Sequence, residues 1–302
     1  MTDELPPFPR AGPYKTLTAQ CHCKSTHFTV KVPTSDLPLS VYLCHCSICR
    51  YTHGTLCSFQ TPLPYGVEPD FVSPSSVESS LTGYMHEEAT FERFFCTTCG
   101  CHIGERGLRE DPSTGLDDWC VTSSIFDTHD EDTFRILSHN FPNPTTEPNL
   151  ATWLPSVNGR TIHPWNPYPS DPRSALAHAR PPEPDLPDRN RLLAQCHCGG
   201  VRFTLPRPSE AEAAHPFLSR YLRTGPTPSS APPNPDTTDN ATSTTSTTTT
   251  NPATDSAHAH TPATGPPTLK RLACLCLCTS CRLTSGTHAV ASTYAPLHAR
   301  VL

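Results

Sequence analysis

The sequence contains no run of 18 apolar residues, so it predicts no membrane-spanning helix. It also lacks an excess of positive charge, because 22 basic residues stand against 28 acidic ones and the net charge is −6. Proteins that neutralise many phosphates are usually basic, so nucleic acid is not expected as a partner. Hydrophobic residues make up only 35% of the chain, whereas proline alone contributes 36 residues. These values predict compact pieces separated by segments that do not fold.

The N-terminus also lacks the features of a secretory signal peptide. Its first ten residues, MTDELPPFPR, have neither a positive end nor an apolar stretch. The expected location is therefore the reducing cytoplasm, with the nucleus as the alternative. Closely spaced cysteines in such a compartment bind metal more often than they form disulfides. The 16 cysteines are accordingly interpreted first as metal ligands.

Two segments of the chain recur, which indicates an internal repeat. Residues 17–33 and 192–208 are identical at nine of 17 positions, at an offset of 175. Residues 44–55 and 276–287 are identical at seven of 12 positions, at an offset of 232. The second copy therefore carries a net insertion of 57 residues. Only 21 residues follow Cys281, so the second copy has no counterpart of a later cysteine pair in the first.

Repeat and composition together predict the domain organisation. The expected parts are a disordered N-terminus at 1–16, a complete zinc domain at 17–163, a proline-rich linker at 164–190 and a partial second domain at 191–302. A segment rich in Thr, Ser and Pro at about 224–267 interrupts the last part, and it is expected to be disordered because it has too few apolar side chains to offset its conformational entropy.

Short segments with alternating apolar and polar residues predict β-strands. Examples are Phe28–Val32 and Phe203–Leu205, and the segments Glu92–Cys96 and Trp119–Ile125 are also expected to be strands. No segment has a convincing helical period over ten residues. The predicted fold class is mainly β, with small sheets tied together by metal.

Cys21-x-Cys23 and Cys96-x-x-Cys99 form the first candidate metal site. Each pair can present two sulfurs from a tight turn, and two such pairs make the closed four-thiolate arrangement of a structural zinc. Such a site can supply about 10 kcal/mol to folding, which would compensate for a thin core. The alternative is four buried free cysteines that act as small hydrophobic side chains.

Cys44-x-Cys46-x-x-Cys49 forms the second candidate site. Three sulfurs within six residues can hold one ion and leave a fourth position open, as in catalytic zinc sites. A substrate thiol could enter that position and be held as a nucleophilic thiolate. The alternative is a closed structural site, completed by Cys57 or Cys101.

Other residues extend the second site and its repeat. Arg50 and Gly54 follow the three cysteines and could shape a pocket for an anionic ligand, although an exposed arginine is more often a solvated surface residue. The second copy keeps five cysteines that could also bind metal, with Cys274 as an extra neighbour that could close the three-cysteine site. These five are Cys196, Cys198, Cys276, Cys278 and Cys281.

The combined motifs resemble those of the glutathione-dependent formaldehyde-activating enzyme family, which also includes centromere protein V. The resemblance is carried by Cys21-His22-Cys23, by the Cys44–Cys49 motif with Arg50 and Gly54, and by Phe95-Cys96-x-x-Cys99-Gly100. It covers roughly residues 17–155, including Leu116-Asp117-Asp118, and only part of the second copy.

The resemblance implies a β-tent fold of small antiparallel sheets and two zinc ions in the complete domain. It implies a structural zinc on the Cys21/Cys23/Cys96/Cys99 set and a more labile zinc on Cys44, Cys46 and Cys49, where glutathione binds. The implied activity is that of a carbon–sulfur lyase, which joins formaldehyde to the glutathione thiol to give S-(hydroxymethyl)glutathione. A small thiol and a small aldehyde would then be the partners.

Two points remain open from the sequence. The sequence identifies no general base and no protein partner.

The competing hypothesis is a non-catalytic zinc-binding scaffold of the centromere protein V type. Such a scaffold would bind zinc fully but would bind no thiol.

Overall fold

The computed structural model of the chain describes residues 10–87, 89, 91–107, 118–142, 150–167, 190–225, 268–293 and 300–301. The segments predicted to be disordered or linkers were 1–16, 164–190 and about 224–267, and of these residues 1–9, 168–189 and 226–267 lie outside the described part, as do Leu116 and Asp117. The chain divides into two compact units, Met1–Arg207 with Ala273–Leu302, and Pro208–Leu272. The domain boundaries drawn from the repeat stay a prediction.

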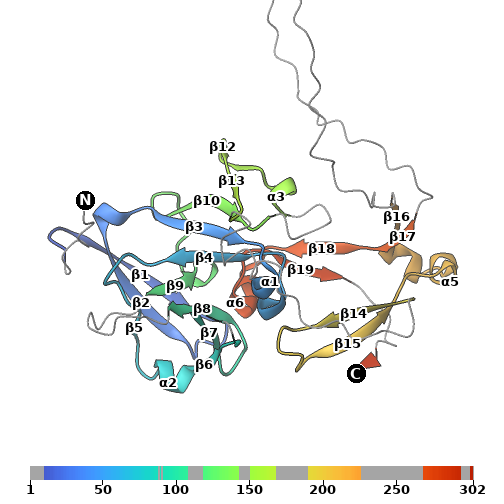
Figure 1. Cartoon of the computed structure of the whole chain (residues 1–302), viewed down its shortest axis with the longest axis horizontal. Coiled ribbons are helices and arrows are strands. Elements are labelled where there is room, and N and C mark those ends of the chain that lie inside the picture. Colours follow the sequence, from blue (N-terminus) through green and yellow to red (C-terminus); the bar gives the residue numbers. More distant parts are fainter. Residues whose placement is uncertain are drawn as a thin grey trace, which may run out of the picture. The chain divides into compact units, whose positions relative to one another are not determined.

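The first unit consists mainly of β-strands (Figure 1). Within the described residues, its largest sheet has eight strands in the order β13-β10-β3-β4-β9-β8-β7-β6. Strand β10 runs parallel to β3 and to β13, and the other neighbours pair antiparallel. The strands are β3 (Leu39–Cys44), β4 (Ser58–Pro62), β6 (Leu81–Tyr84), β7 (Phe91–Cys96), β8 (His102–Gly107), β9 (Trp119–Thr122), β10 (Phe134–Asn140) and β13 (His163–Trp165).

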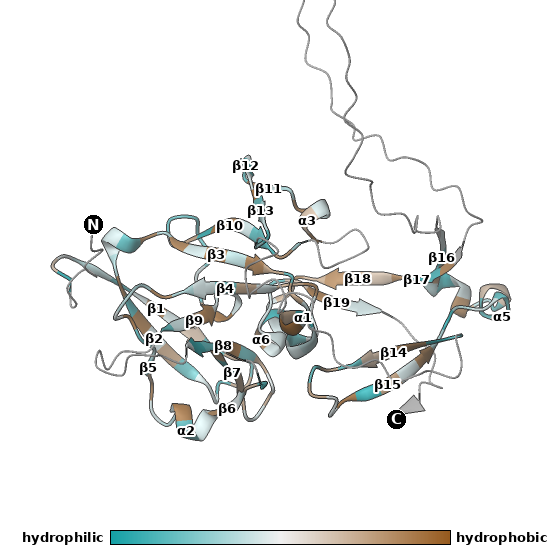
Figure 2. Ribbon diagram, viewed as in Figure 1, coloured by the Kyte–Doolittle hydropathy of each residue, from teal (hydrophilic) through white to brown (hydrophobic). Residues whose placement is uncertain are grey.

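A smaller antiparallel sheet contains β1 (Tyr14–Gln20), β2 (His27–Pro33) and β5 (Asp70–Phe71). Apolar and polar residues follow one another along β1 and β2, as the colours in Figure 2 show. One face of this hairpin is therefore buried, as the alternation in the sequence predicts. The predicted class, mainly β with small antiparallel sheets, is confirmed.

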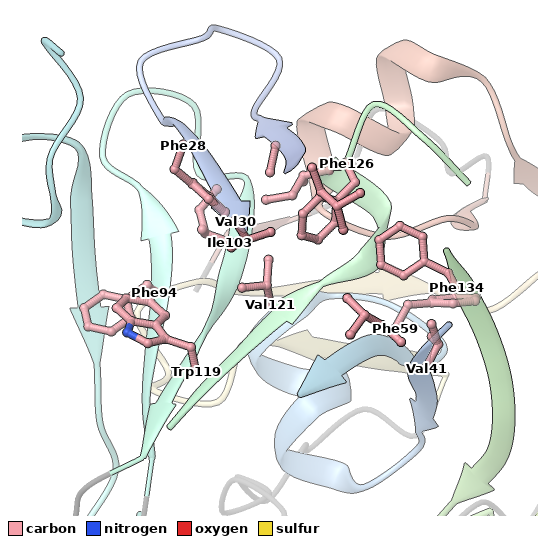
Figure 3. Packing of buried hydrophobic residues seen from close by; sticks show 14 of the residues in the cluster. Phe28, Val30, Val41, Phe59, Phe94, Ile103, Trp119, Val121, Phe126 and Phe134 are labelled. Carbon is pink, nitrogen blue, oxygen red and sulfur yellow. The ribbon is translucent and has the colours of Figure 1, made fainter. Parts of the chain in front are cut away.

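Aromatic residues fill the core of the first unit (Figure 3). The rings of Phe28 and Phe126 meet edge to face at 6.5 Å, and those of Phe94 and Trp119 stack at 5.6 Å. Ile103 is buried beside them. Each fully buried side chain of this size contributes roughly 1.5–3 kcal/mol, so the core is a real source of stability besides any metal.

Helices in the described residues are short, in agreement with the missing helical period. The α-helices of the first unit are α1 (Ser47–His53), α2 (Val77–Ser80), α3 (Leu150–Trp153) and α6 (Thr279–Ser285). The predicted strand Trp119–Ile125 ends at Thr122, and Ser123–Ile125 form a 3-10 helix, η3. The hydroxyl groups of Thr122 and Ser124 bond to each other at 3.0 Å, a local contact of the kind that competes with strand pairing.

The repeated segments form the same local structures. Strands β14 (Arg191–Gln195) and β15 (Arg202–Pro206) make a hairpin like β1–β2, and β20 (Arg300–Val301) pairs with β15. Strands β18 (Ala273–Cys276) and β19 (Val290–Thr293) flank α6 as β3 and β4 flank α1. The helices α1 and α6 both end at a glycine with positive φ, Gly54 at 63° and Gly286 at 67°.

The second unit contains α5 (Glu210–Ala214), the 3-10 helix η4 (Leu218–Tyr221) and the hairpin of β16 (Leu222–Gly225) with β17 (Thr268–Arg271). Ser209 begins α5 with a capping box to Glu212. In both units, no helix of the described residues is long and apolar enough to cross a membrane.

Candidate metal centres and the adjoining cavity

The first cysteine group joins two distant turns. Its four sulfurs, from Cys21, Cys23, Cys96 and Cys99, lie within 4.8 Å of one another. The Sγ of Cys21 lies 3.4 Å from that of Cys23 and 3.6 Å from that of Cys96. A tetrahedron with Zn–S bonds of about 2.3 Å has sulfurs about 3.8 Å apart, so the group fits a single zinc ion.

Local backbone geometry explains why each pair of sulfurs converges. After Cys21 the chain turns through Lys24, which has a φ of 63°, and after Cys96 it turns through Gly100, which has a φ of 71°. The amide of Gly100 donates to the carbonyl of Cys96 at 2.8 Å, which closes the second turn. The two turns then lie side by side because the strands that they follow belong to adjoining parts of one core.

The second cysteine group lies at the start of α1. Cys44 ends β3, Cys46 is the N-cap of α1 and Cys49 lies in its first turn, and the three sulfurs are within 4.8 Å of one another. The described residues offer no fourth Cys, His, Asp or Glu atom to this group. Cys57 and Cys101 are outside it, so the alternative of a closed site completed by either residue finds no support.

The ionisation of its three buried thiols favours a cation at the second group. The side chains of Cys44, Cys46 and Cys49 are only 5%, 8% and 2% exposed. Hydrogen bonds among these thiols raise the pKa of Cys44 well above its ordinary value and lower that of Cys46. Without a cation the three thiols therefore cannot all ionise, and a divalent ion that attracts thiolates relieves this conflict.

Three polar residues that the sequence did not single out surround Cys49. The side-chain amide of Gln60 donates to Cys49 Sγ at 3.8 Å and to Glu105 Oε1 at 3.0 Å. Arg93 Nε lies 3.1 Å from the same Glu105 oxygen, with both side chains largely buried. Such a second layer orients metal ligands and tunes their basicity.

The charges of this layer depend on one another. Burial and, after it, the thiolate of Cys49 raise the pKa of Glu105, Arg93 and Gln60 oppose the rise, and the net pKa is about 7. Burial lowers the pKa of Arg93, but Glu105 and the thiolates of Cys49 and Cys46 outweigh this effect and raise it. A guanidinium therefore stays charged beside the three sulfurs and partly compensates their negative charge.

A cavity of about 370 Å³ lies near the second group, although none of the three cysteines belongs to its described wall. Its wall includes His53 and Arg93, which both reach Cys49, and also Tyr51, Tyr84 and His102. The Nδ1 of His53 lies 2.7 Å from the carbonyl of Cys49, whereas its buried Nε2 has no hydrogen-bond partner in the described structure.

The predicted pocket residues Arg50 and Gly54 lie elsewhere on α1. Neither belongs to the described wall of the cavity. The amide of Gly54 donates to the carbonyl of Arg50 at 2.9 Å and ends the helix. Their assignment to an anionic ligand stays a prediction.

The second repeat forms a third sulfur group. Cys276, Cys278 and Cys281 lie within 4.8 Å of one another, and Cys274 is outside the group. Cys196 and Cys198 have their sulfurs 3.4 Å apart, but no third ligand joins them in the part of the chain that the structure describes. All five have some exposure to solvent, unlike Cys44, Cys46 and Cys49.

Fold and site together define a mainly β domain that combines a four-cysteine and a three-cysteine group, both able to bind zinc. Residues 16–140 match the family model described as glutathione-dependent formaldehyde-activating enzyme, so the chain carries a domain of this family. This match covers both cysteine groups of the first repeat and confirms the resemblance there.

Curated relatives agree with the family model. A protein of Penicillium rubens, provisionally named as a glutathione-dependent formaldehyde-activating enzyme, is 33% identical over 110 residues, which are 36% of this chain and 53% of the relative. A protein of Talaromyces marneffei with the same name is 33% identical over 117 residues, 39% of this chain and 56% of the relative. The chain spans about half the length of these relatives.

Proposed function

We propose that the first domain is a zinc-dependent carbon–sulfur lyase that joins a small aldehyde such as formaldehyde to the thiol of glutathione. The observation that carries the proposal is the three-sulfur group of Cys44, Cys46 and Cys49, which has no fourth ligand in the described residues. It is linked to the cavity by His53, which belongs to the cavity wall and contacts the carbonyl of Cys49. The family match and the names of the relatives supply the substrates.

A zinc ion held by Cys44, Cys46 and Cys49 would lower the pKa of an entering thiol. The residues of the chain then have defined tasks. Gln60 orients the sulfur of Cys49 by its 3.8 Å contact, and Glu105 holds Gln60 and Arg93 in position. Arg93 and His53 face the cavity and can bind the polar groups of the thiol substrate.

The reaction needs no further reactant. The thiol loses its proton, its sulfur forms a bond to the aldehyde carbon, and the electron pair of the C=O bond moves to oxygen, which takes up a proton. The product is a hydroxymethyl thioether, and atoms and charges balance. Holding both reactants in one cavity accounts for the rate gain, because it replaces a bimolecular encounter by a local one.

The test uses the full chain loaded with zinc. Cys49→Ser should release one zinc ion per chain, abolish glutathione binding by calorimetry and leave the far-UV spectrum unchanged. Cys274→Ser is the matched control, because Cys274 is exposed and belongs to no sulfur group in the described residues. Unchanged glutathione binding in Cys49→Ser, or no binding by the wild type, would contradict the proposal.

One observation favours the second candidate, a zinc-binding scaffold. The three sulfurs are at most 8% exposed, as in a purely structural site. A scaffold would retain all its zinc in a glutathione titration and show no heat of binding. The same titration therefore separates the two functions.

A further inference from the structure

The two repeats make one backbone contact twice. The amide of His22 donates to the carbonyl of Leu283 at 3.1 Å, and the amide of His197 donates to the carbonyl of Tyr51 at 3.2 Å. His197 corresponds to His22 at the offset of 175, and Leu283 corresponds to Tyr51 at the offset of 232. The cysteine turn of each repeat thus contacts the helix of the other, with the roles exchanged.

A third contact lies where an axis of symmetry would pass. The hydroxyl groups of Thr55 and Thr287 are 3.5 Å apart, and these residues correspond to each other at the same offset of 232. In a two-fold interface residues on the axis meet their own counterparts, and every other contact occurs twice. The segments that the two repeats share therefore pair as the subunits of a symmetric dimer do.

Hydrogen bonds between α6 and the segment around η3 stabilise this pairing of the two repeats. Arg282 of α6 donates to the carbonyl oxygens of Ser124 and Phe126, the second at 3.2 Å. Thr122 Oγ1 donates to the carbonyl of Gly286 at 2.9 Å. These five residues come from two segments more than 150 residues apart, so the pairing is a tertiary interface and not a local fold.

The pairing of the repeats places the Cys196–Cys198 turn of the second repeat at the cavity of the first domain. Cys196, His197 and Cys198 form part of the cavity wall. The hydroxyl of Tyr84 lies 2.6 Å from His197 Nδ1, and the rings of His86 and His197 are 5.4 Å apart. One wall of the cavity therefore belongs to the second repeat.

The chemistry of the wall suits an anionic thiol. Arg93 supplies a cation, and Tyr84 and the histidines supply neutral polar groups. Because the hydroxyl of Tyr84 lies at His197 Nδ1, the other ring nitrogen of His197 is the one left to contact a ligand.

We propose that the Cys196–Cys198 turn of the second repeat completes the thiol cavity of the first domain, and that His197 is a specificity-determining residue for a thiol that carries a carboxylate. This inference rests on the proposed function, which assigns the cavity to the thiol substrate. In this proposal the incomplete second repeat forms part of the thiol cavity, and this function does not require a metal ion bound to its own cysteines.

The experiment compares two histidines that occupy the same position in the two turns. His197→Ala should weaken glutathione binding to the zinc-loaded full chain about tenfold, equivalent to about 1.4 kcal/mol. His22→Ala should bind glutathione as the wild type does, because His22 does not belong to the described cavity wall. 2-Mercaptoethanol, which has no carboxylate, should lose less than twofold in affinity in His197→Ala.

Two outcomes separate the inference from the proposed function. If the wild type binds glutathione and His197→Ala binds it equally well, this inference alone fails. If the wild type binds neither thiol, the proposed function fails and the thiol cavity with it. The wall itself is tested without any thiol, because Tyr84→Phe should shift the nitrogen resonance of His197 Nδ1, and an unchanged resonance would overturn the contact.

Discussion

Arg93 and Glu105 lie directly opposite each other on β7 and β8, and Arg93 Nε is 3.1 Å from Glu105 Oε1. The pair links the largest sheet to the three-sulfur group, because Gln60 connects the same carboxylate to Cys49. Buried ion pairs contribute little net stability as a unit, but breaking one leaves a charge without its partner.

The first prediction concerns the free-energy cost of removing only one partner of this buried ion pair. Arg93→Met should destabilise the protein at pH 8, by at most about 3–5 kcal/mol, because Glu105 would have to keep a buried carboxylate without its cation or take up a proton. Urea unfolding of the zinc-loaded chain measures the difference. Arg106→Met is the control, since the ion pair of Arg106 with Glu92 is about 30% exposed and should cost about 1 kcal/mol or less. Equal losses in the two variants would show that the Arg93 pair is not buried in solution.

The second prediction concerns pH. The pKa of Glu105 is raised to about 7, mainly by burial, so its protonated form is favoured in the folded state. The stability that follows is fully present below the ordinary carboxyl pKa of 4.5 and is lost as the pH rises through about 7. The stability of Glu105→Gln relative to the wild type should therefore improve between pH 4.5 and pH 8, in addition to a pH-independent cost of leaving Arg93 without its carboxylate. A difference between variant and wild type that does not change with pH would refute the shift.

The third prediction uses two glycines with similar backbones. Gly286 has a φ of +67° and Gly159 a φ of +75°, so alanine is strained at both, by about 1–2 kcal/mol. A Cβ at Gly286 would also lie 2.2 Å from the carbonyl oxygen of His102, whereas a Cβ at Gly159 meets nothing within 4 Å. Gly286→Ala should therefore lower the melting temperature clearly more than Gly159→Ala. Equal shifts would argue against the contact between α6 and β8.

The fourth prediction concerns the other cysteines. Cys57 and Cys101 are 1% and 0% exposed, and burial raises the pKa of both thiols far above the ordinary value. Both should stay protonated and react with iodoacetamide at pH 7.5 at least about 100-fold more slowly than exposed Cys274. Peptide mapping by mass spectrometry after timed labelling measures these rates. Fast labelling of Cys57 in native protein would show that the core opens readily.

The fifth prediction concerns metal removal. A chelator should take zinc from the three-cysteine groups, including that of Cys44, Cys46 and Cys49, before it takes zinc from the four-cysteine group, because three protein ligands hold an ion less tightly than four. Loss of the ion from the four-cysteine group should unfold the domain, since this group joins turns 75 residues apart. Zinc release followed with an indicator dye, together with circular dichroism, should therefore show two phases, with unfolding in the later one. Unfolding in the first phase would reverse this assignment.

The sequence predicted both cysteine groups of the first domain because short spacings bring ligands together in almost any backbone conformation. Cys44, Cys46 and Cys49 lie within six residues, and tight turns hold each pair of the four-cysteine group. The alternation of apolar and polar residues, as along β2, likewise predicted the mainly β fold.

Other parts of the site could not be predicted in this way. Gln60, Arg93 and Glu105 come from three strands, and their meeting depends on strand register. That register is irregular between Phe94 and Phe95, where the pairing of β7 with β8 shifts. The contact of His197 with Tyr84 depends on how the two repeats pair, which no local pattern contains.

Cys46 has two tasks at once, since its sulfur accepts the amide hydrogen of Cys49 at 3.4 Å as the N-cap of α1 and also belongs to the three-sulfur group. Helix formation and ion uptake therefore share one atom, so an event that strengthens one must strengthen the other to the same degree in free energy. The hydrogen-exchange rate of the Cys49 amide therefore reports metal binding. Exchange of this amide with solvent deuterium should slow as the fraction of chains that hold an ion rises.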